Sequence, residues 1–162
     1  VCGRYFPEIK LGKTEEDFYC AIASSFMLSA DNAHAVHPHH PQKTDATNCV
    51  YMNEGIVVKS HAGQKYTSDA VSIAVFKDLC KKANVPVQFF ANRSDEAGGS
   101  TLGNIAMAQV SMNSVDIGLP QLAMHSTYET AGIKDTYYMI QVMTEFFNCH
   151  ISEVNTNVLK VD

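Results

Sequence analysis

The sequence lacks long apolar runs, because none approaches the ~20 residues that a membrane-spanning helix needs. We therefore expect no membrane partner. Basic residues are also few: the formal net charge is −5, and the longest basic cluster is the pair Lys81 and Lys82. Because neutralising phosphates requires a basic surface, we expect no nucleic-acid partner.

Cysteines with metal-binding or redox spacing are missing as well. The five cysteines are odd in number and widely scattered, and no C-x-x-C pair occurs, so neither a zinc ribbon nor a thioredoxin-like motif fits. Reduced and mostly buried thiols are the simplest interpretation, and they predict a cytoplasmic protein. The cysteines are Cys2, Cys20, Cys49, Cys80 and Cys149.

What is present is an alternation of strand and helix patterns over 162 residues, enough for one domain. Short apolar or β-branched runs predict strands near residues 27–29, 55–59, 86–91 and 114–118. Helices are expected after Thr14, after the cap at Ser68 and Asp69, through Ile105, and over residues 136–148. This order predicts an α/β fold, a three-layer sandwich around a mostly parallel sheet.

The other segments carry weaker signals. Residues 1–13 look like an incoming segment, residues 44–54 and 119–134 like loops, and residues 150–162 like a closing strand or a tail. Ser100 is the expected cap of the helix through Ile105. Large apolar side chains of the last helix are expected in the core, namely Met139, Ile140, Met143, Phe146 and Phe147.

Residues 29–41, SADNAHAVHPHHP, follow directly on a predicted buried strand and form the main candidate site. Asp31 is the first charge beyond that strand, and either a metal role or a turn-capping role fits it. Four histidines follow it, and acid followed by imidazoles is a candidate for metal binding or proton transfer. His39 and His40, between two prolines, are expected at the surface, whereas spacing leaves His34 and His37 undecided.

Two further features allow more than one interpretation. The glycines in GGST, residues 98–101, either expose backbone N–H groups for an anion or carbonyl, or merely turn the chain, which we favour. Asp31 and His125 both lie in loops that follow strands, and such loops converge at one edge of an α/β sheet. A shared site is therefore possible, although a catalytic zinc usually takes about three protein ligands.

Four motifs together resemble the aspartyl aminopeptidase family of co-catalytic zinc peptidases: SADNAHAVHP (29–38), NRSD (92–95), GGSTLG (98–103) and GLPQLAMHS (118–126). The resemblance runs from about residue 15 to residue 147. It implies a zinc-peptidase-like fold and a two-metal exopeptidase that removes N-terminal Asp or Glu from peptides. It also implies two divalent metal ions, taken as Zn²⁺, with Asp31 as a ligand of one metal and His125 as a ligand of the other.

The resemblance also implies a substrate pocket. Lys59 matches the position of a lysine that recognises an acidic side chain, Tyr66 matches a pocket tyrosine, and His34 matches a position lining the same site. A cation suits an acidic substrate. Without the resemblance, Lys59 would be taken as a surface lysine at a strand end. His37 is expected to hold the loop through its ring N–H.

The sequence departs from the family in one respect: the family's first half has no counterpart in it. That half carries the first His ligand, the bridging Asp, a Glu ligand, the general-base Glu and an inserted oligomerisation domain. We therefore expect no catalytic residue in this segment, with the general base upstream of residue 1, and residues 1–162 as the C-terminal part of the catalytic domain. The expected partners are acidic peptides, the N-terminal half of the same subunit and, by resemblance, a dodecamer.

Three functions remain in competition at this point. The first is a metalloaminopeptidase whose 162-residue segment is inactive alone and binds zinc weakly. The second is a catalytically inactive scaffold or assembly homologue of the same fold, and the third is a two-metal hydrolase acting on a non-peptide amide. Asp31, His125 and Lys59 argue against the scaffold, which has no need of them.

Overall fold

The computed structural model describes residues 12–155 and 158–162. Cys2 and nearly all of the predicted incoming segment, residues 1–13, lie outside the described residues. The elements, in chain order, are α2 (Glu15–Ala23), β1 (Phe26–Ala30), β2 (Ala33–His34), the 3₁₀ turn η1 (Pro41–Lys43), β3 (Ile56–Ser60), α3 (Ala70–Lys82), β4 (Val87–Ala91), α4 (Leu102–Gln109), β5 (Asn113–Gly118), β6 (Pro120–Leu122), β7 (Thr130–Ala131), α5 (Ile133–Asn148), β8 (Ile151–Asn155) and β9 (Val158–Val161).

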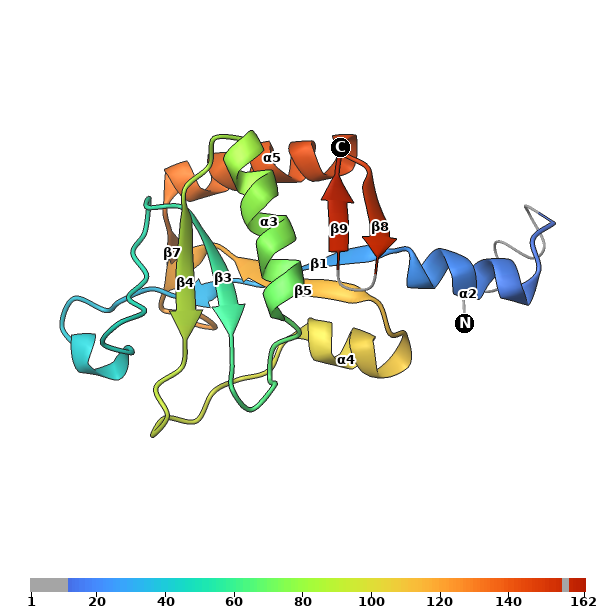
Figure 1. The fold of residues 1–162 in the computed structure, drawn as a ribbon. Helices are drawn as coiled ribbons and strands as arrows, with labels where there is room; N and C mark the ends of the chain where they lie inside the picture. The colour runs from blue at the N-terminus through green and yellow to red at the C-terminus, as the bar shows by residue number, and fades with distance from the viewer. Residues whose placement is uncertain (1–11, 156–157) are drawn as a thin grey trace.

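The central sheet has the strand order β1-β5-β3-β4 (Figure 1). The β1–β5 and β3–β4 pairs are parallel, whereas β3 runs antiparallel to β5. The predicted, mostly parallel sheet is therefore confirmed. The one antiparallel pair has a consequence for the site: β1 and β3 run in opposite directions, so their carboxyl ends lie at opposite ends of the strands of the sheet.

The sheet is covered on both faces, which confirms the predicted three-layer sandwich. On one face, α3 and α5 cover the main core, which includes Ile56, Val58, Phe76, Leu79, Val115, Ile117 and Val142. On the other face lies α4, whose Gly103 packs against Ser29 and Asp116. Alternation along β5 explains the division, because Val115 and Ile117 point to one face and Asp116 to the other.

Side-chain caps set the starts of two helices as the sequence predicts. Thr14 and Asp17 form a reciprocal capping box at the start of α2. Asp69 does the same with Ser72 at the start of α3. The predicted Ser100 cap is wrong, because the residue before α4 is Thr101, which makes no side-chain capping bond.

Two of the residues expected in the core of the last helix are instead exposed. Ile140 and Phe147 have relative exposures of 60% and 79%. Met139, Met143 and Phe146 pack against the core as expected. The helix presents only one stripe of its surface to the sheet, so apolar residues a third of a turn away reach solvent.

Several segments expected to be loops contain short strands. β2 and β6 pair in parallel, and β7 joins β6 antiparallel, which forms a second, small sheet beside the site. The last residues form β8 and β9, which pair antiparallel in a separate two-stranded sheet, so this part of the chain is a pair of strands and neither a single closing strand nor a tail. The last helix also begins earlier than predicted, at Ile133.

The expectation of mostly buried thiols is wrong for the described cysteines. Cys80 is buried, Cys49 and Cys149 are partly buried, and Cys20 is exposed; all four are free. Cys20 is exposed because α2 buries none of its residues and projects from the body of the molecule (Figure 1).

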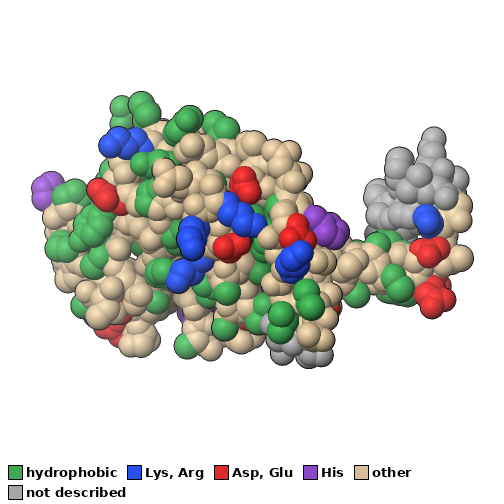
Figure 2. Space-filling view, turned by 45° about the horizontal axis from the view of Figure 1, so that its top comes forward, with side chains coloured by type: hydrophobic (Ala, Val, Ile, Leu, Met, Phe, Trp, Pro, Cys, Tyr) green, Lys and Arg blue, Asp and Glu red, His purple; other side chains and the backbone are tan. Residues whose placement is uncertain are grey.

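The described helices are all too short or too polar to cross a bilayer. The face drawn in Figure 2 carries Lys and Arg side chains close to Asp and Glu side chains, so neither sign of charge dominates it. Apolar side chains also reach the surface, and α5 exposes Ile133, Tyr137, Ile140 and Phe147.

Candidate active site

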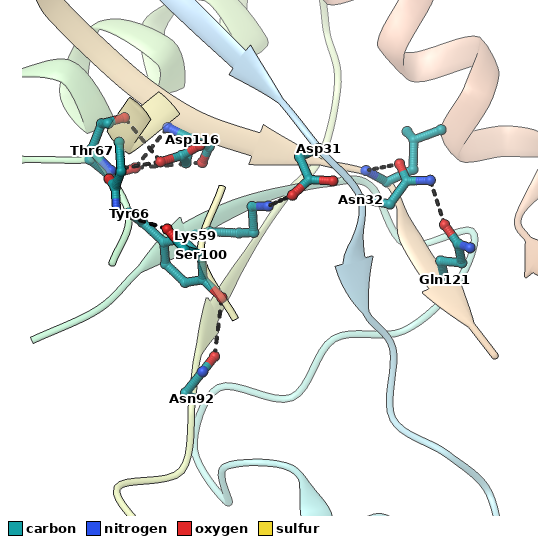
Figure 3. A network of polar contacts seen from close by, with 12 residues as sticks. Asp31, Asn32, Lys59, Tyr66, Thr67, Asn92, Ser100, Asp116 and Gln121 are labelled. Atoms are coloured by element: carbon teal, nitrogen blue, oxygen red, sulfur yellow. Dashed lines mark hydrogen bonds and ion pairs between the residues drawn. The ribbon is translucent and has the colours of Figure 1, made fainter. Parts of the chain in front are cut away.

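A cavity of about 430 Å³ lies between the end of β1, the α4 face of β3 and the loops after β4 and β6. All five residues predicted for the metal and substrate sites line it: Asp31, His34, Lys59, Tyr66 and His125. Asp31 and His125 are therefore brought together, as their positions in strand-following loops predict. Figure 3 shows the polar contacts on the Lys59 side of this cavity.

Asp31 is held where β1 ends. Its backbone N–H donates to the carbonyl of Ile117 at 2.9 Å. Gly118 permits this close approach, because a Cβ there would lie 2.0 Å from the Asp31 carbonyl oxygen. The Asp31 side chain is 50% exposed, so its carboxylate faces the cavity from a fixed backbone.

Lys59 is a buried residue and not a surface lysine at a strand end. Only 2% of Lys59 is exposed, and its Nζ lies 3.3 Å from Oδ2 of Asp31. Since β3 runs antiparallel to β5, Lys59 reaches Asp31 across the face of the sheet rather than from a shared edge. Burial lowers the pKa of the Lys59 ammonium, while the carboxylates of Asp31 and Asp116 oppose that shift.

Tyr66 lies across Lys59, whose Nζ is 5.2 Å from the centre of the ring. The Tyr66 hydroxyl donates to Oδ1 of Asn92 at 3.3 Å (Figure 3). Burial raises the pKa of Tyr66, and the charges of Asp116 and Asp31 add to the shift. The phenol therefore stays protonated and able to donate a hydrogen bond at the cavity wall.

His125 is held in an unusual backbone conformation, with φ of 67°. Its N–H donates to Oε1 of Glu129 at 2.6 Å, which supports the turn. A residue other than glycine in the left-handed region of backbone conformation costs about 1–3 kcal/mol, and such strain concentrates at functional sites. Partial burial lowers the pKa of His34, the neighbouring His125 ring and Lys59 ammonium lower it further, and the Asp31 carboxylate opposes the shift, so the His34 ring is mainly neutral at neutral pH.

The donor chemistry around Asp31 and His125 fits part of a zinc site. Both a half-exposed carboxylate and an imidazole are ordinary zinc ligands, and both line the cavity. The Lys59 ammonium next to Asp31 is a positive charge beside this carboxylate, and a metal cation at Asp31 would be a second one. Across the described residues, however, no three His, Cys, Asp or Glu side chains are grouped to hold an ion. Two ligands would need completion by other groups.

The other histidines of residues 29–41 have different surroundings. His39 and His40 are exposed, as expected. His37 does hold the loop, but its Nδ1 accepts from the backbone N–H of His39 at 3.2 Å, whereas a ring N–H donor was predicted. In the 98–101 segment, the Gly98 carbonyl accepts from Nζ of Lys65 at 2.8 Å, so the loop is anchored there.

Three polar residues near the site were assigned no role from the sequence. Asn92 lies in the NRSD motif, and the buried Asp116 bonds to the partly buried Thr67 beside Tyr66 (Figure 3). The signal for Asp116 is present in the strand Ser-Val-Asp-Ile-Gly, where the charge falls on the face opposite the apolar residues. Nothing in the sequence signals its partner, because Thr67 comes from another element 49 positions away.

Comparisons with known proteins identify the family of the chain. A family model described as "Aminopeptidase I zinc metalloprotease (M18)" matches residues 7–147. The "Probable M18 family aminopeptidase 2" of Clostridium novyi (strain NT) is 52% identical over 140 residues, which is 86% of this chain and 32% of that protein. The chain thus spans about a third of the length of the curated relatives it matches.

Solved structures show the same fold. The "Cryo-EM structure of the Ape4 and Nbr1 complex" contains a chain with a TM-score of 0.86 and 36% identity, covering 90% of this chain and 27% of that one. The "Structure of S. cerevesiae mApe1 dodecamer" gives a TM-score of 0.71 and 26% identity, covering 80% and 28%. With its motifs, its fold and a family model that matches most of its length, the chain belongs to the M18 family of aminopeptidase I zinc metalloproteases.

Proposed function

We propose that this chain is the C-terminal part of the catalytic domain of a metalloaminopeptidase that removes N-terminal Asp or Glu from peptides. The single observation that carries the proposal is that Asp31, His125 and Lys59 line one cavity. Membership of a zinc metalloprotease family supports the chemistry. The acidic specificity rests on Lys59 and its surroundings.

In this proposal Asp31 and His125 each bind a different divalent ion, taken as Zn²⁺. When bound, the ions supply Lewis-acid activation of water and of the scissile carbonyl. Asp31 presents its carboxylate from a backbone fixed against β5, and His125 presents its ring from a strained turn. The general base and the other ligands come from elsewhere in the polypeptide, consistent with a segment that spans about a third of its relatives.

Lys59, Tyr66 and His34 form the pocket for the substrate's first side chain. A carboxylate entering the cavity meets a buried ammonium, with which it forms a strong charge-assisted hydrogen bond. The neutral His34 ring offers a further donor without repelling the substrate. The Tyr66 hydroxyl stays protonated and donates to Asn92, so Tyr66 forms an uncharged wall of the pocket. A neutral first residue leaves the buried ammonium without this partner.

The proposal extends to assembly and location. A relative of the same fold is described as a dodecamer, and we propose homo-oligomerisation for the complete protein. The free thiols of the described cysteines fit a reducing, cytoplasmic compartment.

The test uses the complete polypeptide that contains this segment. It is assayed on matched peptides that begin with Asp, Glu, Ala or Leu, before and after chelation, with metal content measured by mass spectrometry. We expect release of Asp and Glu only, about two ions per subunit, and recovery of activity on adding Zn²⁺. Release of neutral residues at equal rates would exclude the acidic pocket. A folded, metal-free and inactive protein would favour an inactive assembly homologue.

A further inference from the structure

A buried polar cluster lies behind the substrate pocket, between the sheet and α4. Its centre is Asp116, which is 0% exposed although it carries a carboxylate. Oδ2 of Asp116 accepts from the backbone N–H of Thr67 at 2.6 Å and from the Thr67 hydroxyl at 3.0 Å. The backbone N–H of Asp116 donates to Oγ of Ser68 at 2.9 Å. The pocket residues named so far make none of these contacts.

These bonds fix the chain directly beside Tyr66. The N–H of Thr67 belongs to the peptide unit that follows Tyr66, so anchoring it also fixes the plane of that peptide. Tyr66 is then held at two points, by Asp116 through Thr67 and by Asn92 at its hydroxyl (Figure 3). With both points fixed, the Tyr66 ring is held in its position across Lys59.

Gly103 of α4 packs directly against this cluster and leaves no room for a side chain. A Cβ at Gly103 of α4 would lie 2.7 Å from Oγ of Ser29 and 3.0 Å from Oδ1 of Asp116. Oδ1 of Asp116 has no hydrogen-bond partner within the described residues. Burying a charged oxygen without a partner is costly, so the arrangement is not explained by stability alone.

From these contacts we infer that Asp116 is a positioning residue: it holds Thr67, fixes Tyr66 across Lys59, and so sets the preference for an acidic N-terminal residue. The inference rests on the proposed function. The role belongs to the oxygen that accepts from Thr67, and not to the net charge of the carboxylate.

The test compares variants of the complete polypeptide by a selectivity ratio, which is kcat/KM for a peptide beginning with Asp divided by kcat/KM for the same peptide beginning with Ala. Thr67→Val removes the hydroxyl donor but keeps the backbone N–H bond to Asp116, so the ratio should fall about three- to fivefold, mainly through KM for the Asp peptide. Thr67→Ser keeps the hydroxyl and should retain the wild-type ratio. Asp116→Ala removes both bonds to Thr67, so the ratio should fall further than in Thr67→Val, by about tenfold or more. Asp78→Asn, which changes an exposed carboxylate on α3, should leave the ratio unchanged.

Asp116→Asn separates acceptor from charge. Its side-chain oxygen can still accept from Thr67, and its NH₂ group replaces the oxygen that has no partner within the described residues, so we expect a ratio within about twofold of wild type, less than the loss of one such bond. The inference is wrong if the selectivity ratio of Asp116→Asn is as low as that of Asp116→Ala. It is also wrong if Thr67→Val lowers kcat/KM equally for the Asp and the Ala peptide. A wild-type ratio near one would instead refute the proposed acidic specificity, so the two failures are distinguishable.

Discussion

Nζ of Lys59 lies 3.3 Å from Oδ2 of Asp31, yet the lysine side chain is 3% exposed and the aspartate side chain is 50% exposed. The two partners therefore do not have equivalent roles. Asp31 is open to a ligand from the cavity even while Lys59 contacts it. Lys59 is desolvated and fixed, and such a group discriminates strongly between charged and neutral substrates.

Lys59→Met should remove the preference for acidic peptides. Methionine keeps the length of the chain but has no charge to meet the substrate carboxylate, so kcat/KM for an N-terminal Asp peptide should fall about 10- to 100-fold more than for its Ala counterpart. Metal content should not change. Steady-state kinetics on the two peptides measures the effect, and Lys77→Met, at the ring of Phe89, is the control. Equal losses on both peptides would show that the pocket assignment is wrong.

Asp31→Asn and His125→Ala should each reduce bound metal by about one ion of two, because the two residues are proposed to serve different ions. Mass spectrometry of the purified complete polypeptide gives the count. Asp31→Asn also takes the carboxylate partner from the buried Lys59 ammonium. Because Asp31 is half exposed, the loss of stability should be smaller than the about 3–5 kcal/mol of a fully buried pair.

The double variant Asp31→Asn with Lys59→Met separates ligand loss from unfolding. It removes both charges, so it should recover much of the stability lost in Asp31→Asn. It should still lack the metal. A double variant that regains full metal content would show that Asp31 is not a ligand.

The order of elements was predictable from the sequence because caps and periodicity are local signals. Thr14 and Asp69 begin helices by bonding to residues three positions away, so the chain itself carries that information. The joint position of Asp31 and His125 was also predictable, because both follow strands.

Burial and strand direction were harder to predict. Nothing local indicates that β3 runs antiparallel to β5, and this direction makes Lys59 a buried residue on the face of the sheet. Two-residue strands such as β2 carry no periodic pattern, and partners such as Thr67 and Asp116 meet only after folding. Exposure of Phe147 depends on which stripe of α5 faces the sheet.

Gly118→Ala should destabilise the protein and displace Asp31. The added Cβ would lie 2.0 Å from the Asp31 carbonyl oxygen, a backbone atom that cannot rotate away, so a cost of about 1–3 kcal/mol is expected. Urea unfolding measures it. Gly99→Ala is the matched control, since a Cβ there meets nothing within 4 Å. Equal stability of the two variants would contradict the close approach.

Asp135 should make stability fall as pH rises above its ordinary pKa of 3.8. Its buried carboxylate accepts from the backbone N–H groups of Asn53 and Gly55, but burial outweighs these bonds and raises its pKa in the folded protein. The folded state then binds more protons than the unfolded state, so this group's contribution to stability is lost as pH rises through the folded pKa. Asp135→Asn cannot titrate. The unfolding free energy of wild type minus that of Asp135→Asn should therefore shrink between about pH 4 and the raised pKa and then level off, whereas the same difference for exposed Asp78→Asn should show no such fall. A difference that grows with pH would show that the hydrogen bonds, and not burial, control this carboxyl group.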